Sequence, residues 1–310
     1  MHFMAIIGTG LLIVLTTWLV LVLLMVRARL YPPRLSALRA LFTLGRAHPD
    51  DLGFAFAPLT FDITYIGRAL RLSASLVLHP QANGQLVIVL HGFADSSAGA
   101  AAWLPALHRC DVNVLLVDLP GHGESGEAIC SAGWFERDAV SLVISQIQQR
   151  HPQESRRITL FGISMGAATA LATACSDSRI AAVIADSPYA DFPSACELHA
   201  RLFGLPGPLF QRAATWIIAG YYGVKFEELA PSRLLAEVPC PILLIQAEQD
   251  QLISPTDAAN MRTTVQARKD GKSRELVIAG ASHILALAKA PEQYEEALRQ
   301  FLQMTGDDRP

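Results

Sequence analysis

The stretch ITLFGISMG, residues 158–166, decides the fold of this chain. Its first four residues, Ile158 to Phe161, are typical of a buried strand, and the small apolar run from Ser164 to Ala174 is typical of a helix packed on a sheet. Between them stands Gly-x-Ser-x-Gly, whose two glycines permit the close backbone approach of a sharp strand-to-helix turn. Such a turn presents its serine hydroxyl at the sheet edge, so Ser164 is predicted to be a nucleophile.

Seven further apolar segments are predicted to be strands. The first two alternate in polarity around Gly67-Arg68 and fit a hairpin, whereas the later ones are continuous, as in a parallel sheet covered on both faces. Helical patterns separate the later strands, at residues 134–150 and 291–304 among others, which predicts a doubly wound α/β domain. Residues 187–238 interrupt this rhythm and are predicted to form a helical lid. The predicted strands are 61–66, 71–78, 86–90, 112–117, 181–185, 241–245 and 275–278.

A serine hydroxyl needs a base that removes its proton. In folds that carry this kind of serine turn, the acid and then the histidine base follow the serine along the chain. Only His199 and His283 do so. His199 lies within the predicted lid, where a histidine on a polar helix face is the ordinary interpretation. His283 follows a strand through Gly280-Ala281-Ser282, where a loop can deliver an imidazole to the sheet edge. We therefore predict that His283 is the base.

The acid that orients this histidine should stand at another strand end between the two residues. Asp250 fits, because it follows the strand at 241–245 after Gln246-Ala247-Glu248-Gln249. A carboxylate there would accept the imidazole N–H, fix its tautomer and stabilise the imidazolium. Asp186, at the end of the preceding strand, and Glu248 remain alternatives.

Two loops at strand ends bear on the same site. His91-Gly92-Phe93 can offer the backbone N–H of Phe93, alongside that of Met165, to a developing oxyanion. His91 is then a residue that orients the loop. The turn from Asp118 to Ser125 lacks the glycine series and lysine of a nucleotide site, and is predicted to be structural.

Hydrophobic residues are concentrated at the amino end. The 310-residue chain is 51% hydrophobic and 17% charged, with a net charge of −3. This balance excludes collagen-like and disordered chains and binding to nucleic acid through overall positive charge. Residues 3–26 carry no charge and reach about 36 Å as a helix, enough to span a bilayer. A cleaved signal peptide is the alternative, but the run is too long and ends without small residues.

The arginines that follow this segment indicate its orientation. Arg27, Arg29, Arg34 and Arg39 lie after it and no Lys or Arg precedes it, which predicts a single-pass membrane protein with its carboxyl side in the cytoplasm. The predicted division is an anchor at 1–28, a linker at 29–56 and a catalytic domain at 57–310. Within the linker, residues 35–44 could lie on the membrane or pack on the domain. The five scattered cysteines are predicted to be reduced.

Taken together, these motifs resemble the α/β-hydrolase superfamily over roughly residues 56–304. The features that carry the resemblance are His91-Gly92-Phe93, the turn at 118–125, the serine turn at 162–166, Asp250 and His283. More narrowly, Asp186-Ser187-Pro188-Tyr189 and the short helical insert resemble the serine-aminopeptidase-like (Bem46-like) membrane-anchored hydrolases. One departure is that relatives usually carry His-Gly-x-x-Asp where this chain has Gln246 to Asp250. The resemblance implies an α/β-hydrolase fold with a mostly parallel eight-stranded sheet.

The expected function is that of a serine hydrolase cleaving ester or thioester bonds through Ser164, His283 and Asp250. The expected partners are a small acyl ester or lipid and the membrane, with no nucleic acid, metal or cofactor. Alternatives are a peptidase or amidase of the same fold and a non-catalytic, membrane-tethered binding module.

Overall fold

A computed structural model describes residues 2–202, 204–205 and 207–306 of the chain. Met1, Phe203, Pro206 and residues 307–310 lie outside the described residues. The predicted anchor, lid and catalytic domain each include some of these positions.

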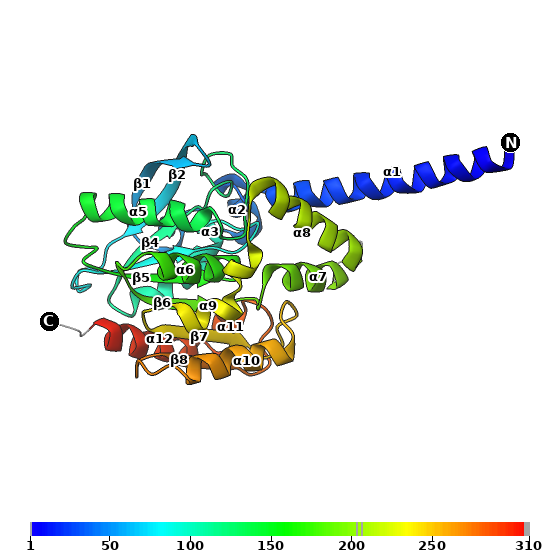
Figure 1. Cartoon of the computed structure of the whole chain (residues 1–310). Helices are drawn as coiled ribbons and strands as arrows, with labels where there is room; N and C mark the ends of the chain where they lie inside the picture. Colours follow the sequence, from blue (N-terminus) through cyan, green and yellow to red (C-terminus); the bar gives the residue numbers. More distant parts are fainter. Residues whose placement is uncertain (1, 203, 206, 307–310) are drawn as a thin grey trace.

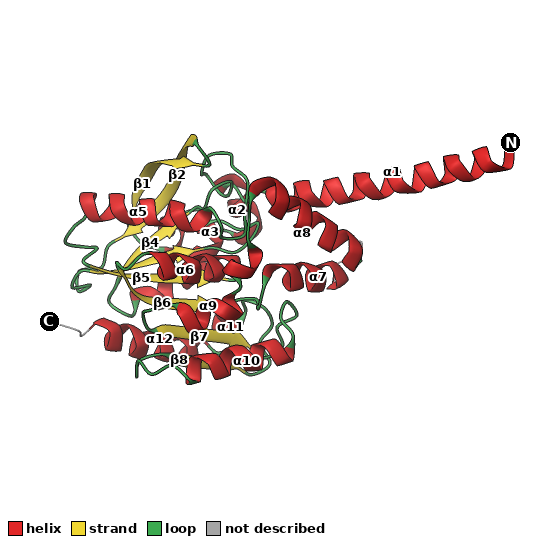
Figure 2. Cartoon of the chain, in the orientation of Figure 1, coloured by secondary structure: helices red, strands yellow, loops and turns green. Residues whose placement is uncertain are grey.

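An eight-stranded sheet forms the centre of the molecule, with the order β1-β2-β4-β3-β5-β6-β7-β8 (Figure 2). β1 pairs with β2 and β2 with β4 in antiparallel fashion, and the other five pairs are parallel. All eight predicted strands are present, which confirms the α/β fold class. Their bounds are β1 Ala57–Tyr65, β2 Arg68–Val77, β3 Gln85–Leu90, β4 Asn113–Val117, β5 Arg157–Ile163, β6 Ile180–Asp186, β7 Ile242–Ala247 and β8 Arg274–Ile278.

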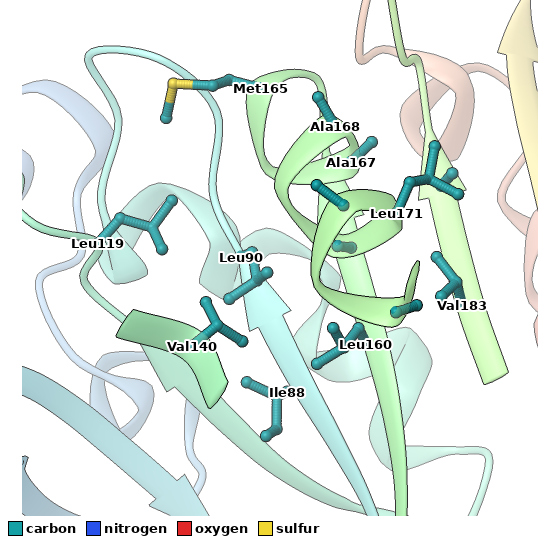
Figure 3. Close-up of a cluster of buried hydrophobic side chains, with 14 of the residues drawn as sticks. Ile88, Leu90, Leu119, Val140, Leu160, Met165, Ala167, Ala168, Leu171 and Val183 are labelled. Atoms are coloured by element: carbon teal, nitrogen blue, oxygen red, sulfur yellow. The ribbon is translucent and has the colours of Figure 1, made fainter. Parts of the chain in front are cut away.

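Helices cover both faces of the sheet, which explains the continuous apolar runs of its inner strands. On β3, Ile88 and Leu90 face one helical layer and Val87 and Val89 face the other. Figure 3 shows the first of these layers, where Leu171 and its helix lie over the sheet. This layer contains α5 Glu136–Arg150, α6 Met165–Ser176, α9 Pro231–Glu237 and α10 Pro255–Gln266, and the opposite one α3 Ser97–Ala100, α4 Leu104–His108, α11 Ala286–Lys289 and α12 Pro291–Gly306.

The predicted hairpin forms, but its turn lies one residue earlier than Gly67-Arg68. Ile66 and Gly67 join β1 to β2, with φ of 50° and 71°. A two-residue turn of this kind needs positive φ at both central positions. Arg68 therefore already belongs to the strand.

Residues 187–238 contain two longer helices, α7 Phe192–Leu202 and α8 Pro208–Tyr222, followed by the 3₁₀ turn Phe226–Leu229 and α9. Figure 1 shows α7 and α8 projecting from the carboxyl edge of the parallel strands, where α8 lies beside the long amino-terminal helix α1, His2–Leu30. Within α1, residues 6–30 are long and apolar enough to cross a membrane.

The segment between α1 and the sheet contains a short helix, α2 Ala37–Leu44, and the 3₁₀ turn Pro49–Leu52. Ser36 caps α2 at its start and Gly45 ends it at φ 69°. Ala40 is completely buried against the domain, whereas Leu38 and Phe42 are 68% and 82% exposed. The helix therefore packs on the domain and also leaves an apolar face open.

Candidate active site

Ser164 sits on a sharp turn between β5 and α6. Its backbone has φ 54° and ψ −113°, and its N–H donates to the Asp186 carbonyl at 2.8 Å. A Cβ on Gly162 would lie 2.1 Å from the Gly166 oxygen, and one on Gly166 would lie 2.0 Å from the Leu90 oxygen. Only glycine fits at either position, so these residues allow the strained turn that presents the serine.

The structure brings Ser164, His283 and Asp250 together from three strand ends. The Ser164 Oγ lies 2.9 Å from His283 Nε2, and His283 Nδ1 lies 2.8 Å from Asp250 Oδ2. Asp250 Oδ1 also accepts the Leu252 N–H at 2.8 Å, which fixes the carboxylate. The side chains of His283 and Asp250 are 17% and 4% exposed. This geometry fits an imidazole whose Nδ1–H donates to Asp250 and whose Nε2 accepts the serine proton.

The two alternative acids make other contacts. Glu248 accepts the Gly280 N–H at 2.8 Å. Asp186 is completely buried and accepts hydrogen bonds from the Tyr294 hydroxyl at 2.5 Å and the Ser187 hydroxyl at 2.8 Å. Burial raises the pKa of Asp186. Of the three candidate carboxylates, the one within hydrogen-bond distance of the His283 ring is Asp250.

A second layer of contacts supports the histidine loop. The Ile284 N–H donates to Ser187 Oγ at 3.2 Å, which ties the residue after His283 to the end of β6. Tyr294, which donates to Asp186 beside Ser187, itself accepts the indole N–H of Trp103 at 3.0 Å. The sequence does not predict this support, because the contacts join elements that are distant in the chain; the local signal for it is the polar pair Asp186-Ser187 at a strand end.

The loop after β3 approaches Ser164 closely. A Cβ on Gly92 would lie 3.6 Å from the Ser164 Cβ. His91 is fully buried, and burial lowers its pKa to about 4, so the ring is neutral. Its Nε2 accepts the Leu119 N–H at 3.0 Å, and its Nδ1 lies 2.7 Å from the Gly92 oxygen. His91 thus orients this loop, as its position in the sequence predicts.

The turn at residues 118–125 is held by its own side chains. The Asp118 carboxylate accepts the N–H groups of Ser97 at 2.6 Å and Glu124 at 2.8 Å. The Ser125 hydroxyl donates to the Asp118 carbonyl at 2.6 Å. These contacts fit the structural role predicted for the turn.

A cavity of about 200 Å³ opens over Ser164. His199 of α7 lies in its wall, and desolvation together with the nearby His283 lowers the pKa of His199. The sequence predicts an ordinary histidine on a polar helix face, because the pattern of α7 does not show which face meets the serine. Burial raises the pKa of the Cys196 thiol to about 11, so this neighbour stays protonated. The cavity is lined by Met25, Ala28, Arg29, Phe93, Ser164, Met165, Tyr189, Phe192, Ala195, Cys196, His199, Leu205, Gln211 and Leu252.

All five cysteines are free thiols, as predicted. Within the described ranges, no three His, Cys, Asp or Glu side chains gather as metal ligands would.

Several known proteins are similar to this chain in sequence or in fold. The model of the α/β-hydrolase fold family matches residues 85–215. The chain is 25% identical to the uncharacterized protein YqkD of Bacillus subtilis (strain 168) over 232 residues, which is 74% of each chain. It is 24% identical to the uncharacterized protein YfhR of Escherichia coli O157:H7 over 227 residues, covering 71% and 72% of the two chains.

Among solved structures, the esterase Pf2001 of Pyrococcus furiosus superposes with a TM-score of 0.71 at 22% identity. The match covers 89% of this chain and 98% of the esterase. The strand order, the serine turn after β5 and the family match all indicate the same fold. The chain therefore has the α/β-hydrolase fold.

Proposed function

We propose that the protein is a serine hydrolase that cleaves carboxylic ester or thioester bonds through an acyl-enzyme. The observation that carries the proposal is the hydrogen-bonded series Ser164 Oγ, His283 Nε2 and Nδ1, and Asp250 Oδ2, with steps of 2.9 and 2.8 Å. The esterase Pf2001, whose fold is similar over nearly its whole length, adds support.

In the proposed reaction, Ser164 Oγ attacks the substrate carbonyl carbon while His283 Nε2 takes its proton. The carbonyl oxygen becomes an oxyanion that the backbone N–H groups of Phe93 and Met165 stabilise. When the intermediate collapses, His283 returns the proton to the leaving alcohol or thiol. Water then attacks the acyl-serine by the same steps and releases the acid.

In this mechanism Asp250 stabilises the imidazolium through its hydrogen bond and does not take the proton itself. Its low exposure strengthens this interaction, because buried charges are less screened by water. The Leu252 N–H and the histidine ring together satisfy both of its oxygens.

The proposed substrate is a small acyl ester or thioester of lipid-like character. The cavity over Ser164 is lined mainly by apolar groups, including Tyr189, Phe192 and Leu252. An apolar wall favours a hydrocarbon chain over a charged or peptide-like group. The narrower assignment to membrane-anchored, serine-aminopeptidase-like hydrolases remains a prediction.

Labelling with a fluorophosphonate probe tests the nucleophile. Wild-type protein should be labelled, and Ser164→Ala should lose both the label and at least about three orders of magnitude in kcat/KM for p-nitrophenyl esters. Ser176→Ala is the control, because it removes an exposed hydroxyl at the other end of α6. Labelling that persists in Ser164→Ala would disprove the assignment.

The same measurements separate the alternatives. Faster turnover of amides than of esters, again lost in Ser164→Ala, would indicate a peptidase or amidase. Absence of both labelling and turnover in wild-type protein would favour a membrane-tethered binding module.

We further propose that α1 is a retained anchor and that the catalytic domain, residues 57–310 with the lid at 187–238, faces the cytoplasm. The four arginines at 27, 29, 34 and 39 support this orientation. Retention is supported by packing, since Val22 is completely buried and Arg29 binds Gln211 and Thr215 of α8. Cleavage after the apolar run would remove part of this contact.

Fractionation and a carboxyl-terminal reporter test the topology. The intact chain should stay with membranes after alkaline carbonate extraction, and a fused cytoplasmic reporter should be active. Replacing Arg27 and Arg39 by Glu should reduce the correctly oriented fraction. A soluble, shortened product would instead indicate a cleaved signal peptide.

A further inference from the structure

The cavity over Ser164 has a wall that comes from α1, far from the catalytic residues in sequence. Met25, Ala28 and Arg29 of α1 line it together with Phe192 and His199 of α7. The helix proposed as the membrane anchor therefore borders the space above the nucleophile.

Side-chain contacts hold α1 against the lid at this point. The Arg29 guanidinium donates to the Gln211 carbonyl at 3.1 Å and to Thr215 Oγ1 at 2.7 Å, and also binds the Gln211 side chain. The Gln211 amide contacts the Met25 sulfur at 4.0 Å. Nearer the amino end, the rings of Trp18 and Phe210 lie 5.9 Å apart. Figure 1 shows the resulting arrangement, with α8 lying along the carboxyl-terminal part of α1.

The position of the cavity along α1 indicates how deep the cavity lies relative to the bilayer. Arg27 is the first charged residue after the apolar run, so it marks the headgroup side of the boundary. Met25 lies two residues earlier, at the edge of the hydrocarbon. Trp18 lies nine residues before Arg27, about 13 Å further along the helix axis. The end of the α7–α8 pair that carries Phe210 thus reaches the depth of the acyl chains.

Exposed apolar side chains occupy that end of the lid. Leu202, Leu205 and Leu209 are 53%, 49% and 75% exposed. Leu205 also lines the cavity over Ser164. The cavity therefore extends from the serine toward side chains that would contact lipid.

We infer that α1 is one wall of the acyl-binding site, so that the acyl chain lies against Met25 on a path from Ser164 toward Leu205 and the bilayer. This inference rests on the proposed hydrolase function and assigns a substrate class, membrane lipids or lipid-like acyl esters whose ester group lies near the headgroup boundary. Met25 is then a specificity-determining residue, and its size limits the acyl chain that the site accepts.

Chain-length selectivity of the full-length protein in detergent micelles tests the inference. The quantity measured is the ratio of kcat/KM for p-nitrophenyl octanoate to that for the acetate. Met25→Trp narrows the site and should lower this ratio about tenfold, and Met25→Ala should shift the preferred chain to a longer ester. Leu24→Trp and Leu24→Ala are the controls, since Leu24 is the adjacent residue and is 56% exposed.

Equal ratios in the Met25 and Leu24 variants would overturn the inference while leaving the hydrolase proposal intact. If the wild-type protein neither turns over esters nor is labelled by the probe, the proposed function itself is contradicted.

A photoreactive alkyl fluorophosphonate gives a second measurement that does not depend on turnover. The probe forms a bond from its phosphorus to Ser164 Oγ with release of fluoride, and a diazirine on its alkyl chain then reports what that chain touches. Cross-links should fall on the peptide that contains Met25. Cross-links confined to peptides outside α1 and the α7–α8 pair would exclude this path.

Discussion

At the scale of single residues, Ser164 occupies a strained conformation that its surroundings impose. A side chain on Gly166 would meet the Leu90 carbonyl, and the positive φ of Ser164 costs energy that the packed α6 and sheet offset. The strain places the hydroxyl next to His283 without further motion. Preorganisation of this kind lowers the cost of reaching the transition state.

Two buried histidines near the same edge make stability depend on pH. His91 and His122 are both completely buried, and burial is the main reason that the pKa of each falls to about 4. In the unfolded chain the same two histidines bind protons at a higher pH than in the folded protein. The free energy of unfolding should therefore decrease as pH falls from about 6.5 toward 4. Asp95, whose pKa burial raises to about 6, acts in the opposite direction.

The contribution of His122 can be isolated by substitution. Between pH 7 and pH 5, wild-type protein should lose about 2 kcal/mol more of its unfolding free energy than His122→Asn does. Urea denaturation of the detergent-solubilised protein at the two pH values measures this difference. Identical pH dependence in the two proteins would mean that His122 is not buried in its neutral form.

At the scale of elements, the pairing of α1 with α8 depends on Arg29. Replacing it by Ala removes the hydrogen bonds to Gln211 and Thr215, so α8 should open more often. Hydrogen–deuterium exchange of the α8 amides should accelerate about tenfold, which corresponds to a loss of about 1.4 kcal/mol of local stability. Peptides from α12 are the internal reference and should not change.

Unchanged exchange in α8 would show that apolar packing alone holds the helix. Arg29→Lys helps to distinguish hydrogen bonding from apolar packing as the cause. It keeps the charge but loses the forked geometry that reaches both Gln211 and Thr215.

At the scale of the whole molecule, local patterns predict the sheet and much of the site. The strands are recognisable because each inner one is a short apolar run, and Ser164, Asp250 and His283 each directly follow a strand or lie in the loop after it. Contacts between distant elements leave no such pattern. The Tyr294 hydroxyl meets Asp186 across 108 residues, and neither helix periodicity nor strand length indicates that pairing.

The wall of the cavity over Ser164 is likewise built by distant elements. A sequence of uncharged residues from 3 to 26 predicts a spanning helix, but not which of its faces meets the lid. For the same reason, the sequence indicates only that His199 lies on a polar helix face. The α1 residues and His199 line the same cavity because α8 packs against both α1 and α7.

The long separation between Arg29 and Gln211, 182 residues, also has a consequence for biosynthesis. α1 is synthesised before the central sheet and, as the proposed anchor, can enter the membrane while the sheet is still being translated. Its partner on α8 is made only after six of the eight strands. With α1 as the proposed anchor, we expect the nascent chain to be tethered to the membrane long before the cavity over Ser164 closes, and to complete its folding at the bilayer surface.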